Sequence, residues 1–257
     1  MARRFASPRS ILITGASNGI GAALAIDYAA SGIFLALTGR NAERLEAVAR
    51  QCRERGAGVR TAAIDVTDGP ALQAWIGAVD DEHPLDLVVA NAGISAGTAS
   101  SAKDLEKVRE IFAVNVNGLL DTIEPAMSRM RPRRKGQLAL VSSIAGFRGL
   151  PGTAAYAASK AAVRSYGEGL RGLLWEDGIG VSVVCPGYVV SGMTAVNTFP
   201  MPFIMSAERA ARIIRRGLAR DKARIAFPWP MYFAVWLLGT LPPAWTDPIL
   251  RRLPRNP

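Results

Sequence analysis

The sequence contains little of what structural metal sites and disulfide frameworks require. Only two of its 257 residues are cysteines, Cys52 and Cys185, and they lie far apart and form no CxxC motif. The single histidine, His83, lies in a charged run, which favours a solvated loop residue over a ligand because metal sites need clustered ligands. We therefore expect neither a disulfide nor a bound metal.

Long apolar runs are also missing. Every stretch long enough to span a bilayer is interrupted by proline or charge, so no transmembrane helix is predicted. The basic start of the chain runs directly into a short strand-like segment, without the apolar region of a signal peptide. We expect a cytoplasmic protein, with peripheral contact at the inner face of the membrane as an alternative raised by the C-terminal segment.

Acidic residues are outnumbered by basic ones. Lys and Arg total 31 against 21 Asp and Glu, which gives a net charge of +10. Two explanations of this surplus are equally good. Either the basic residues lie on solvated helix faces, or they attract an anionic cofactor, an acyl carrier or a lipid surface. Because the chain shows no recognition module and no basic–aromatic interleaving, we expect no nucleic-acid partner.

Short apolar runs alternate with helical patterns along the chain. Strands are expected at 11–14, 33–38, 59–66, 85–90, 138–142, 181–185 and 224–227, and helices at 20–30, 42–55, 105–130 and 153–175. Such apolar strands need cover on both faces, which predicts a doubly wound parallel α/β sheet of the Rossmann-like class. We expect a single domain over residues 1–257, with a core at 9–227 and a variable aromatic C-terminal extension at 228–257.

The extension has an unusual composition. Residues 225–246 carry no charge but include Phe227, Trp229, Tyr232, Phe233, Trp236 and Trp245. Prolines on both sides confine the expected helix to 231–241, which is too short to cross a bilayer. Two interpretations stay open: an interfacial or substrate-gating element, or aromatic side chains that pack on the core or on a dimer partner.

A glycine-rich turn joins the first expected strand to the first expected helix. It reads Thr14-Gly15-Ala16-Ser17-Asn18-Gly19-Ile20-Gly21. Glycines permit a tight turn and let backbone amides approach a pyrophosphate at the helix N-terminus. The GxxxGxG spacing directly after a strand favours a dinucleotide site over an ordinary strand-to-helix turn.

Three polar side chains suit acid–base chemistry. Ser143 follows the strand at 138–142, Tyr156 lies 13 residues later, and Lys160 follows Tyr156 by four. Positions four apart share a helix face, so Tyr156 and Lys160 are expected to point into one cleft. A nearby ammonium and an oxidised nicotinamide both favour the phenolate and lower the tyrosine pKa. Ser143 can hold the substrate oxygen.

Together these segments resemble the short-chain dehydrogenase/reductase family, in its compact branch. The motifs occur in the family's order and spacing between residues 10 and 220: TGASNGIG, Asn91-Ala92-Gly93, Asn115, Ser143, the YAASK run from Tyr156 to Lys160, and Pro186-Gly187. The resemblance implies a catalytic site of Ser143, Tyr156, Lys160 and Asn115. In it Tyr156 transfers the proton, Lys160 also holds the nicotinamide ribose, and Asn115 anchors a water that relays protons.

The resemblance also implies which residues bind the cofactor. Asp65 and Val66 resemble the family's adenine contact, and Ser191 stands where the family usually has threonine. The implied set is Gly15, Ser17, Asn18, Gly19, Ile20, Gly21, Arg40, Asp65, Val66, Asn91, Ala92, Gly93, Tyr156, Lys160, Pro186, Gly187, Val189 and Ser191.

Cofactor choice depends on the end of the second strand. NAD enzymes place an acid there for the ribose 2′-hydroxyl, whereas an arginine accommodates the 2′-phosphate of NADP. This chain has Gly39 at the position of the acid, followed by Arg40. On this electrostatic argument we expect NADP(H) to be preferred over NAD(H). The alternative is that Arg40 only begins a polar helix.

The segment after Pro186-Gly187 is apolar and rich in methionine. It holds Met193, Phe199, Met201, Phe203, Ile204 and Met205, and Phe147 would add a further wall. Apolar walls favour an apolar substrate, so the first hypothesis is an NADPH-dependent oxidoreductase acting on a carbonyl or secondary alcohol of lipid or acyl type. Two alternatives stay open: a 3-oxoacyl-carrier-protein reductase, and a non-catalytic NADP-sensing or scaffold protein, a class that usually loses the tyrosine.

Small residues in the helix at 153–175 point to self-association. They are Ala154, Ala155, Ala157, Ala158, Ala161 and Ala162. The family pairs this helix across a two-fold axis, and small residues allow close approach, so we expect a homodimer or homotetramer.

Overall fold

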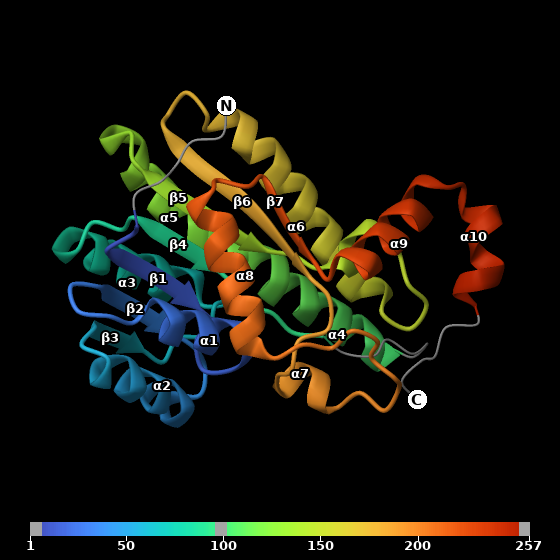
Figure 1. Ribbon diagram of the computed structural model, residues 1–257, viewed down its shortest axis with the longest axis horizontal. Coiled ribbons are helices and arrows are strands. Elements are labelled where there is room, and N and C mark those ends of the chain that lie inside the picture. The colour runs from blue at the N-terminus through green and yellow to red at the C-terminus, as the bar shows by residue number, and fades with distance from the viewer. Residues whose placement is uncertain (1–6, 96–101, 252–257) are drawn as a thin grey trace.

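The structure is a computed structural model that describes residues 7–95 and 102–251. Its centre is one parallel sheet of seven strands in the order β3-β2-β1-β4-β5-β6-β7 (Figure 1). The strands are β1 (Ser10–Thr14), β2 (Phe34–Thr38), β3 (Gly58–Ala62), β4 (Leu87–Ala90), β5 (Gly136–Val141), β6 (Ile179–Pro186) and β7 (Arg224–Phe227). The strand order reverses between β1 and β4, the point at which doubly wound sheets bind their ligands.

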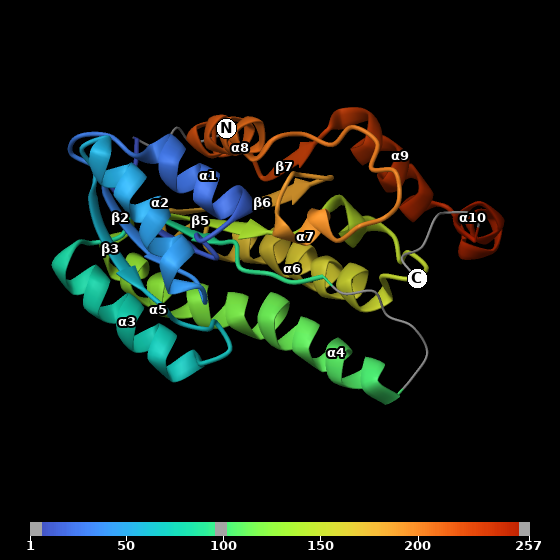
Figure 2. The ribbon, with the colours of Figure 1, turned by 90° about the horizontal axis from the view of Figure 1, so that it is seen from below.

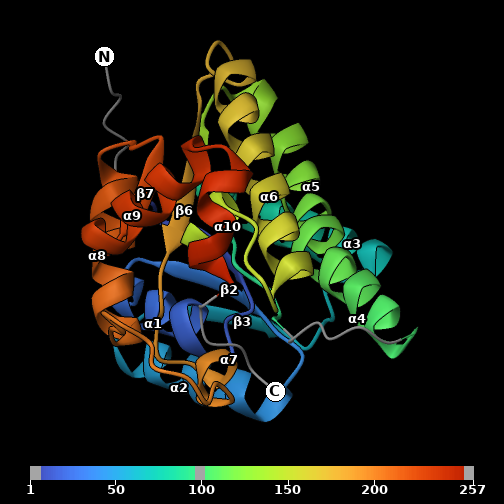
Figure 3. The same ribbon diagram turned by 90° about the vertical axis from the view of Figure 1, so that its right-hand side faces the viewer.

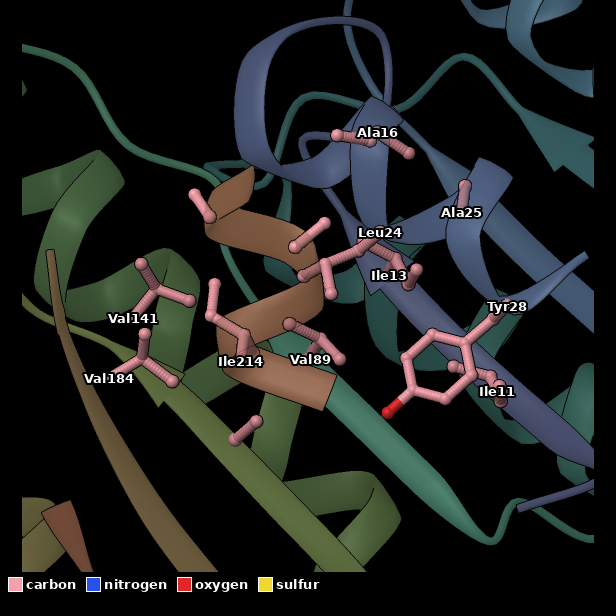
Figure 4. Close-up of a cluster of buried hydrophobic side chains, with 14 of the residues drawn as sticks. Ile11, Ile13, Ala16, Leu24, Ala25, Tyr28, Val89, Val141, Val184 and Ile214 are labelled. Atoms are coloured by element: carbon pink, nitrogen blue, oxygen red, sulfur yellow. The ribbon is translucent and has the colours of Figure 1, made fainter. Parts of the chain in front are cut away.

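Helices cover both faces of this sheet (Figure 2). One face carries α1 (Gly19–Tyr28), α2 (Ala42–Glu54) and α8 (Ala207–Ala219); the other carries α3 (Gly69–Glu82), α4 (Ala102–Phe112), α5 (Gly118–Arg133) and α6 (Ala154–Leu173). Successive strand residues alternate between the two cores, so Ile11 and Ile13 join one and Leu12 the other. Figure 4 shows the first core, where side chains from the strands meet Leu24, Tyr28 and Ile214. The doubly wound fold is thereby confirmed.

The sequence missed two of the covering helices. Both α3 and α8 begin at a capping side chain: Asp68 Oδ1 accepts from the amide of Ala71 at 3.2 Å, and Ser206 Oγ from that of Arg209 at 3.3 Å. The helix expected at 105–130 is α4 and α5 joined by a π-helical turn, η1 (Ala113–Asn117). The strand expected at 59–66 ends at Ala62, so Asp65 and Val66 lie in the loop that follows.

The C-terminal extension forms two helices, α9 (Trp229–Thr240) and α10 (Pro243–Leu250). α9 begins earlier than expected, because a proline in the first helical turn lacks only an amide proton that has no partner there anyway. α10 lies at the end of the molecule, beyond α9, and faces the viewer in Figure 3. None of the helices within 7–95 and 102–251 has the length and apolar character needed to cross a bilayer.

His83 and the two cysteines occupy unremarkable positions. His83 is exposed at the end of α3, and its ring stacks on Phe34 with 3.7 Å between centroids. Cys52 and Cys185 are free and buried. Within the described part of the chain, no three His, Cys, Asp or Glu side chains are grouped to hold a metal.

Thr14 ties the two strands at the switch point together. Its Oγ1 accepts from the backbone amides of Asn91 at 3.1 Å and Ala92 at 3.2 Å. Thr38, its register partner on β2, is equally buried, but its Oγ1 has no hydrogen-bond partner among the described residues. The two threonines therefore have the same burial and differ in whether the hydroxyl is hydrogen-bonded.

We predict that Thr14→Val lowers the free energy of unfolding by about 1 to 3 kcal/mol, because valine has the same shape but leaves the part-buried amides of Asn91 and Ala92 without their acceptor. Thr38→Val should leave stability unchanged or raise it. Urea unfolding of both variants measures the difference, and equal losses in the two variants would contradict the assignment.

Candidate active site

The glycine-rich turn lies at the carboxyl end of β1 and has no room for side chains at its three glycines. Gly15 and Gly19 adopt left-handed φ angles of 65° and 56°, which favour glycine. A β-carbon on Gly15 would lie 2.9 Å from Ala92 Cα, and one on Gly21 would collide with the carbonyl oxygen of Gly15. A backbone packed this closely at the start of α1 leaves a bare surface that fits a dinucleotide pyrophosphate.

Asn91 holds this turn against β4. Its Nδ2 donates to the carbonyl oxygen of Thr14 at 2.9 Å and to that of Gly15 at 3.2 Å. Both hydrogens of the amide are thus used within the protein. Asn91 thereby fixes the glycine-rich turn to the end of β4.

The predicted catalytic side chains meet at the carboxyl end of β5. Ser143 begins the short 3₁₀ helix η2 (Ile144–Phe147), where its Oγ accepts from the amide of Ala145 at 3.1 Å. Tyr156, on α6, lies close enough to the Ser143 hydroxyl for that hydroxyl to affect its pKa. The Nζ of Lys160, one helical turn later, is 5.8 Å from the centroid of the Tyr156 ring. The arrangement expected from the YAASK spacing is therefore present.

Burial has the largest effect on the pKa values of Tyr156 and Lys160. It raises the pKa of Tyr156, while the nearby Ser143 hydroxyl acts in the opposite direction. It also lowers the pKa of Lys160 to about 8. The Lys160 ammonium donates to the carbonyl oxygen of Val141 at 2.9 Å. Burial therefore disfavours the charged forms of both Tyr156 and Lys160.

Asn115 lies in the π-helical turn η1 and is fully buried. Its Oδ1 accepts from the amide of Ile94 at 2.8 Å, and its Nδ2 donates to the carbonyl oxygen of Ile94 and to Ser159 Oγ, both at 3.0 Å. A β-carbon on Gly93 would lie 3.1 Å from Asn115 Oδ1 and 3.2 Å from Lys160 Nζ. Asn115 and Lys160 therefore converge on Gly93. Sequence reasoning missed Ser159, although it stands within the YAASK motif.

The residues expected to bind the adenosine end of the cofactor follow the carboxyl ends of β2 and β3. The side chain of Arg40 is 59% exposed, with its Nη1 3.7 Å from Asp65 Oδ2. A β-carbon on Gly39 would lie 3.1 Å from Ser17 Oγ, so the hydroxyl and the guanidinium flank one corner. Val66 is buried against Gly118.

The end of β6 and the segment after it pack against both η2 and the glycine-rich turn. Pro186 accepts a hydrogen bond from Ser143 Oγ at 3.3 Å, and Val189 is buried. Ser191 caps the short helix α7 (Gly192–Ala195), and a β-carbon on Gly19 would lie 2.9 Å from its Cβ. Ser191 therefore lies directly against the glycine-rich turn.

The expected apolar walls are only partly in place. Phe203 and Ile204 are 59% and 43% exposed, and Met205 is buried beneath the loop. Sequence reasoning missed Met231 of α9: a β-carbon on Gly187 would lie 3.1 Å from its Sδ and 3.3 Å from Ile144 Cδ1. The extension thus supplies a wall between the two loops that hold Ser143 and Gly187.

Comparisons with known proteins agree with this geometry. The family model described as short chain dehydrogenase matches residues 9–199. A protein of Myxococcus xanthus, named as an uncharacterized oxidoreductase, is 40% identical over 96% of this chain and 98% of its own length. An 11-beta-hydroxysteroid dehydrogenase-like protein 4A of Arabidopsis thaliana is 32% identical over 90% of this chain and 80% of its own length.

A solved structure gives the same result. The short chain dehydrogenase/reductase of Burkholderia phymatum in complex with NAD superimposes with a TM-score of 0.81 at 26% identity, over 97% of both chains. The chain therefore belongs to the short-chain dehydrogenase/reductase family. It is an oxidoreductase that acts on substrates of the CH–OH type and has a fold that binds NAD or NADP.

Proposed function

We propose that the protein is an NADPH-dependent oxidoreductase that interconverts a hydrophobic carbonyl compound and its secondary alcohol. The convergence of Ser143, Tyr156 and Lys160 beside Asn115, at the carboxyl edge of the sheet, carries this proposal. The same arrangement argues against a non-catalytic sensing or scaffold protein. We propose one catalytic domain over the whole chain, to which the extension at 228–257 contributes.

In this proposal Tyr156 gives its phenolic proton to the substrate oxygen during reduction and takes it back during oxidation. The Ser143 hydroxyl holds that oxygen. Lys160 stabilises the phenolate once the tyrosine has lost its proton, and Asn115 keeps Lys160 and the loop after β4 in place. A bound nicotinamide supplies or accepts the hydride.

Replacing Tyr156 with Phe tests the assignment, because the change removes the proton and keeps the ring. We expect turnover to fall by about 10²- to 10⁴-fold, with NADPH affinity nearly unchanged. The measurements are NADPH absorbance with a panel of ketones and a fluorescence titration of NADPH. Activity within twofold of wild type, about the scatter of such comparisons, would remove Tyr156 from the mechanism.

Three features support a preference for NADP(H). No acid occupies the end of β2, the Arg40 guanidinium is exposed there, and Ser17 Oγ lies beside Gly39. A 2′-phosphate needs charged and hydroxyl donors of this kind. The ion pair with Asp65 is long and exposed, so it costs little to break.

Arg40→Asp should therefore weaken NADPH binding and shift the ratio of kcat/KM values toward NADH. The new carboxylate repels a 2′-phosphate and can accept from a 2′-hydroxyl. Steady-state kinetics with both cofactors measures the ratio, and Arg44→Asp, one helical turn further on α2, controls for added negative charge. An unchanged ratio would refute the role of Arg40.

The substrate class follows from the site's walls and the extension. Met231, Ile144 and Phe147 are apolar and meet at the loop after Ser143. Such walls favour a lipid-like or acyl-chain substrate. The alternative, a 3-oxoacyl-carrier-protein reductase, is separated by steady-state assays that compare acetoacetyl carriers with free ketones.

We also propose a homodimer or homotetramer built on α6. Of its alanines, Ala155 and Ala157 are buried inside the fold, but Ala154, Ala158 and Ala162 are exposed in one stripe. Tyr166 and Leu173 on the same helix are 43% and 66% exposed. A two-fold contact needs only one such self-complementary surface.

Light scattering at micromolar concentration should give a multiple of the 27.3 kDa monomer mass. Ala162→Arg should reduce the mass to that of the monomer, because a long charged side chain blocks close helix approach. Leu237→Arg, on exposed α9, is the control. A monomeric wild type would exclude the proposal.

We also propose that the outer face of α9 makes peripheral contact with a membrane, in a protein that we expect in the cytoplasm. Trp229, Phe233 and Trp236 are 67%, 44% and 40% exposed, and Phe233 contacts both tryptophan rings. Their spacing places them on one helix face, opposite Met231, Tyr232 and Val235. Aromatic side chains favour the membrane interface, and the net charge of +10 favours anionic lipid.

Flotation with anionic vesicles at low salt tests this contact. Wild type should float, and the double variant Trp229→Gln, Phe233→Gln should remain in the soluble fraction, because it loses the aromatic anchors. Tyr166→Gln, Leu173→Gln, which alters exposed apolar residues of α6, should float like wild type. If wild type stays soluble, the outer face of α9 does not bind membranes.

A further inference from the structure

Ser159 lies between the two parts of the site that carry Tyr156 and Asn115. It is fully buried, and its hydroxyl makes two hydrogen bonds. Oγ donates to the carbonyl oxygen of Tyr156 at 2.8 Å and accepts from Asn115 Nδ2 at 3.0 Å. A hydroxyl has one proton and a carbonyl oxygen can only accept, so the direction of both bonds is determined.

Asn115 extends this connection to the loop after β4. One hydrogen of its amide goes to Ser159 and the other to the carbonyl oxygen of Ile94, while its Oδ1 accepts from the amide of Ile94. The Ile94 amide, both hydrogens of the Asn115 side-chain amide and the Ser159 hydroxyl are therefore all used in the chain Ile94–Asn115–Ser159–Tyr156. We call this chain the Ser159 brace. It joins the loop that borders the cofactor cleft to the backbone of the catalytic tyrosine.

A serine inside a helix often hydrogen-bonds the carbonyl oxygen of the preceding turn and does nothing more. Ser159 differs because a buried amide on another helix, 44 residues away in sequence, occupies its acceptor side. Loss of the hydroxyl leaves that amide hydrogen unpaired in a site closed to water, and frees the Tyr156 carbonyl from its extra bond.

We propose that Ser159 is a positioning residue that sets the turn carrying Tyr156 and Lys160 against Asn115. This inference rests on the proposed roles of Tyr156 and Asn115. It assigns Ser159 no contact with substrate or cofactor, so its effect is on kcat and on the titration of Tyr156.

The variant Ser159→Ala tests the proposal, with Ser182→Ala as its matched control. Ser182 is also fully buried, on β6, but its Oγ has no hydrogen-bond partner within the described chain. In reduction with NADPH and any ketone that wild type turns over, we expect kcat of Ser159→Ala to fall about tenfold. KM for NADPH should stay within about twofold, because the cofactor contacts are unchanged. Ser182→Ala should match wild type in both.

The pH profile separates positioning from general loosening. Reduction needs protonated Tyr156, so kcat falls as pH rises through the pKa of that residue. A tyrosine held less closely beside Lys160 gains less stabilisation of its phenolate, which raises its pKa. The fall in kcat should therefore move to higher pH in Ser159→Ala and not in Ser182→Ala.

Amide hydrogen exchange provides a measurement independent of activity. In the cofactor-free protein, Ser159→Ala should exchange faster than wild type in residues 91–95 and 153–162, and Ser182→Ala should not. Unchanged exchange in both segments would overturn the Ser159 brace. Faster exchange with an unchanged kcat and pH profile would overturn the positioning role. If wild type reduces no carbonyl compound, the proposed function fails, and exchange alone then decides whether the brace exists.

Discussion

The site depends on one buried ammonium group. Lys160 Nζ donates to the carbonyl oxygen of Val141, and its backbone carbonyl oxygen accepts from Ser142 Oγ at 2.6 Å. Two glycines leave room for it: a β-carbon on Gly93 would lie 3.2 Å from Nζ, and one on Gly146 2.8 Å from the Lys160 main chain. Burying a cation is costly, which is why its pKa falls to about 8. Gly93 and Gly146 thus leave the space that the Lys160 side chain and main chain occupy.

The C-terminal extension is built into the same region. The ring of Phe147 lies near two guanidinium groups, with 4.6 Å to that of Arg164 and 5.1 Å to that of Arg224. Glu168 pairs with both arginines, and Arg224 also donates to Tyr232 of α9 at 3.1 Å. A network of charge and aromatic contacts thus connects α9 to the short helix that begins at Ser143.

The fold could be predicted because its signals are local and repeated. Most of the seven strands are short apolar runs, and the YAASK spacing alone places Tyr156 and Lys160 on one helix face. Residues such as Ser159 and Met231 could not be found in this way, since their partners lie on other elements. Apolar character also did not indicate which side chains face the site. Phe203 and Ile204 have the apolar character of a pocket wall, yet both are exposed to solvent.

The reversal of strand order between β1 and β4 has a consequence for the protein's synthesis. β1 pairs with β2 early, but its other neighbour begins only at Leu87, and Met231 is joined to the same site still later. Contacts this distant in sequence form slowly and only after the intervening chain has emerged. A ribosome-bound fragment that ends before β6 therefore contains Tyr156 and Lys160 but lacks the segments around Gly187 and Met231. Such a fragment cannot catalyse the reaction until these last segments have been synthesised and have packed against the site.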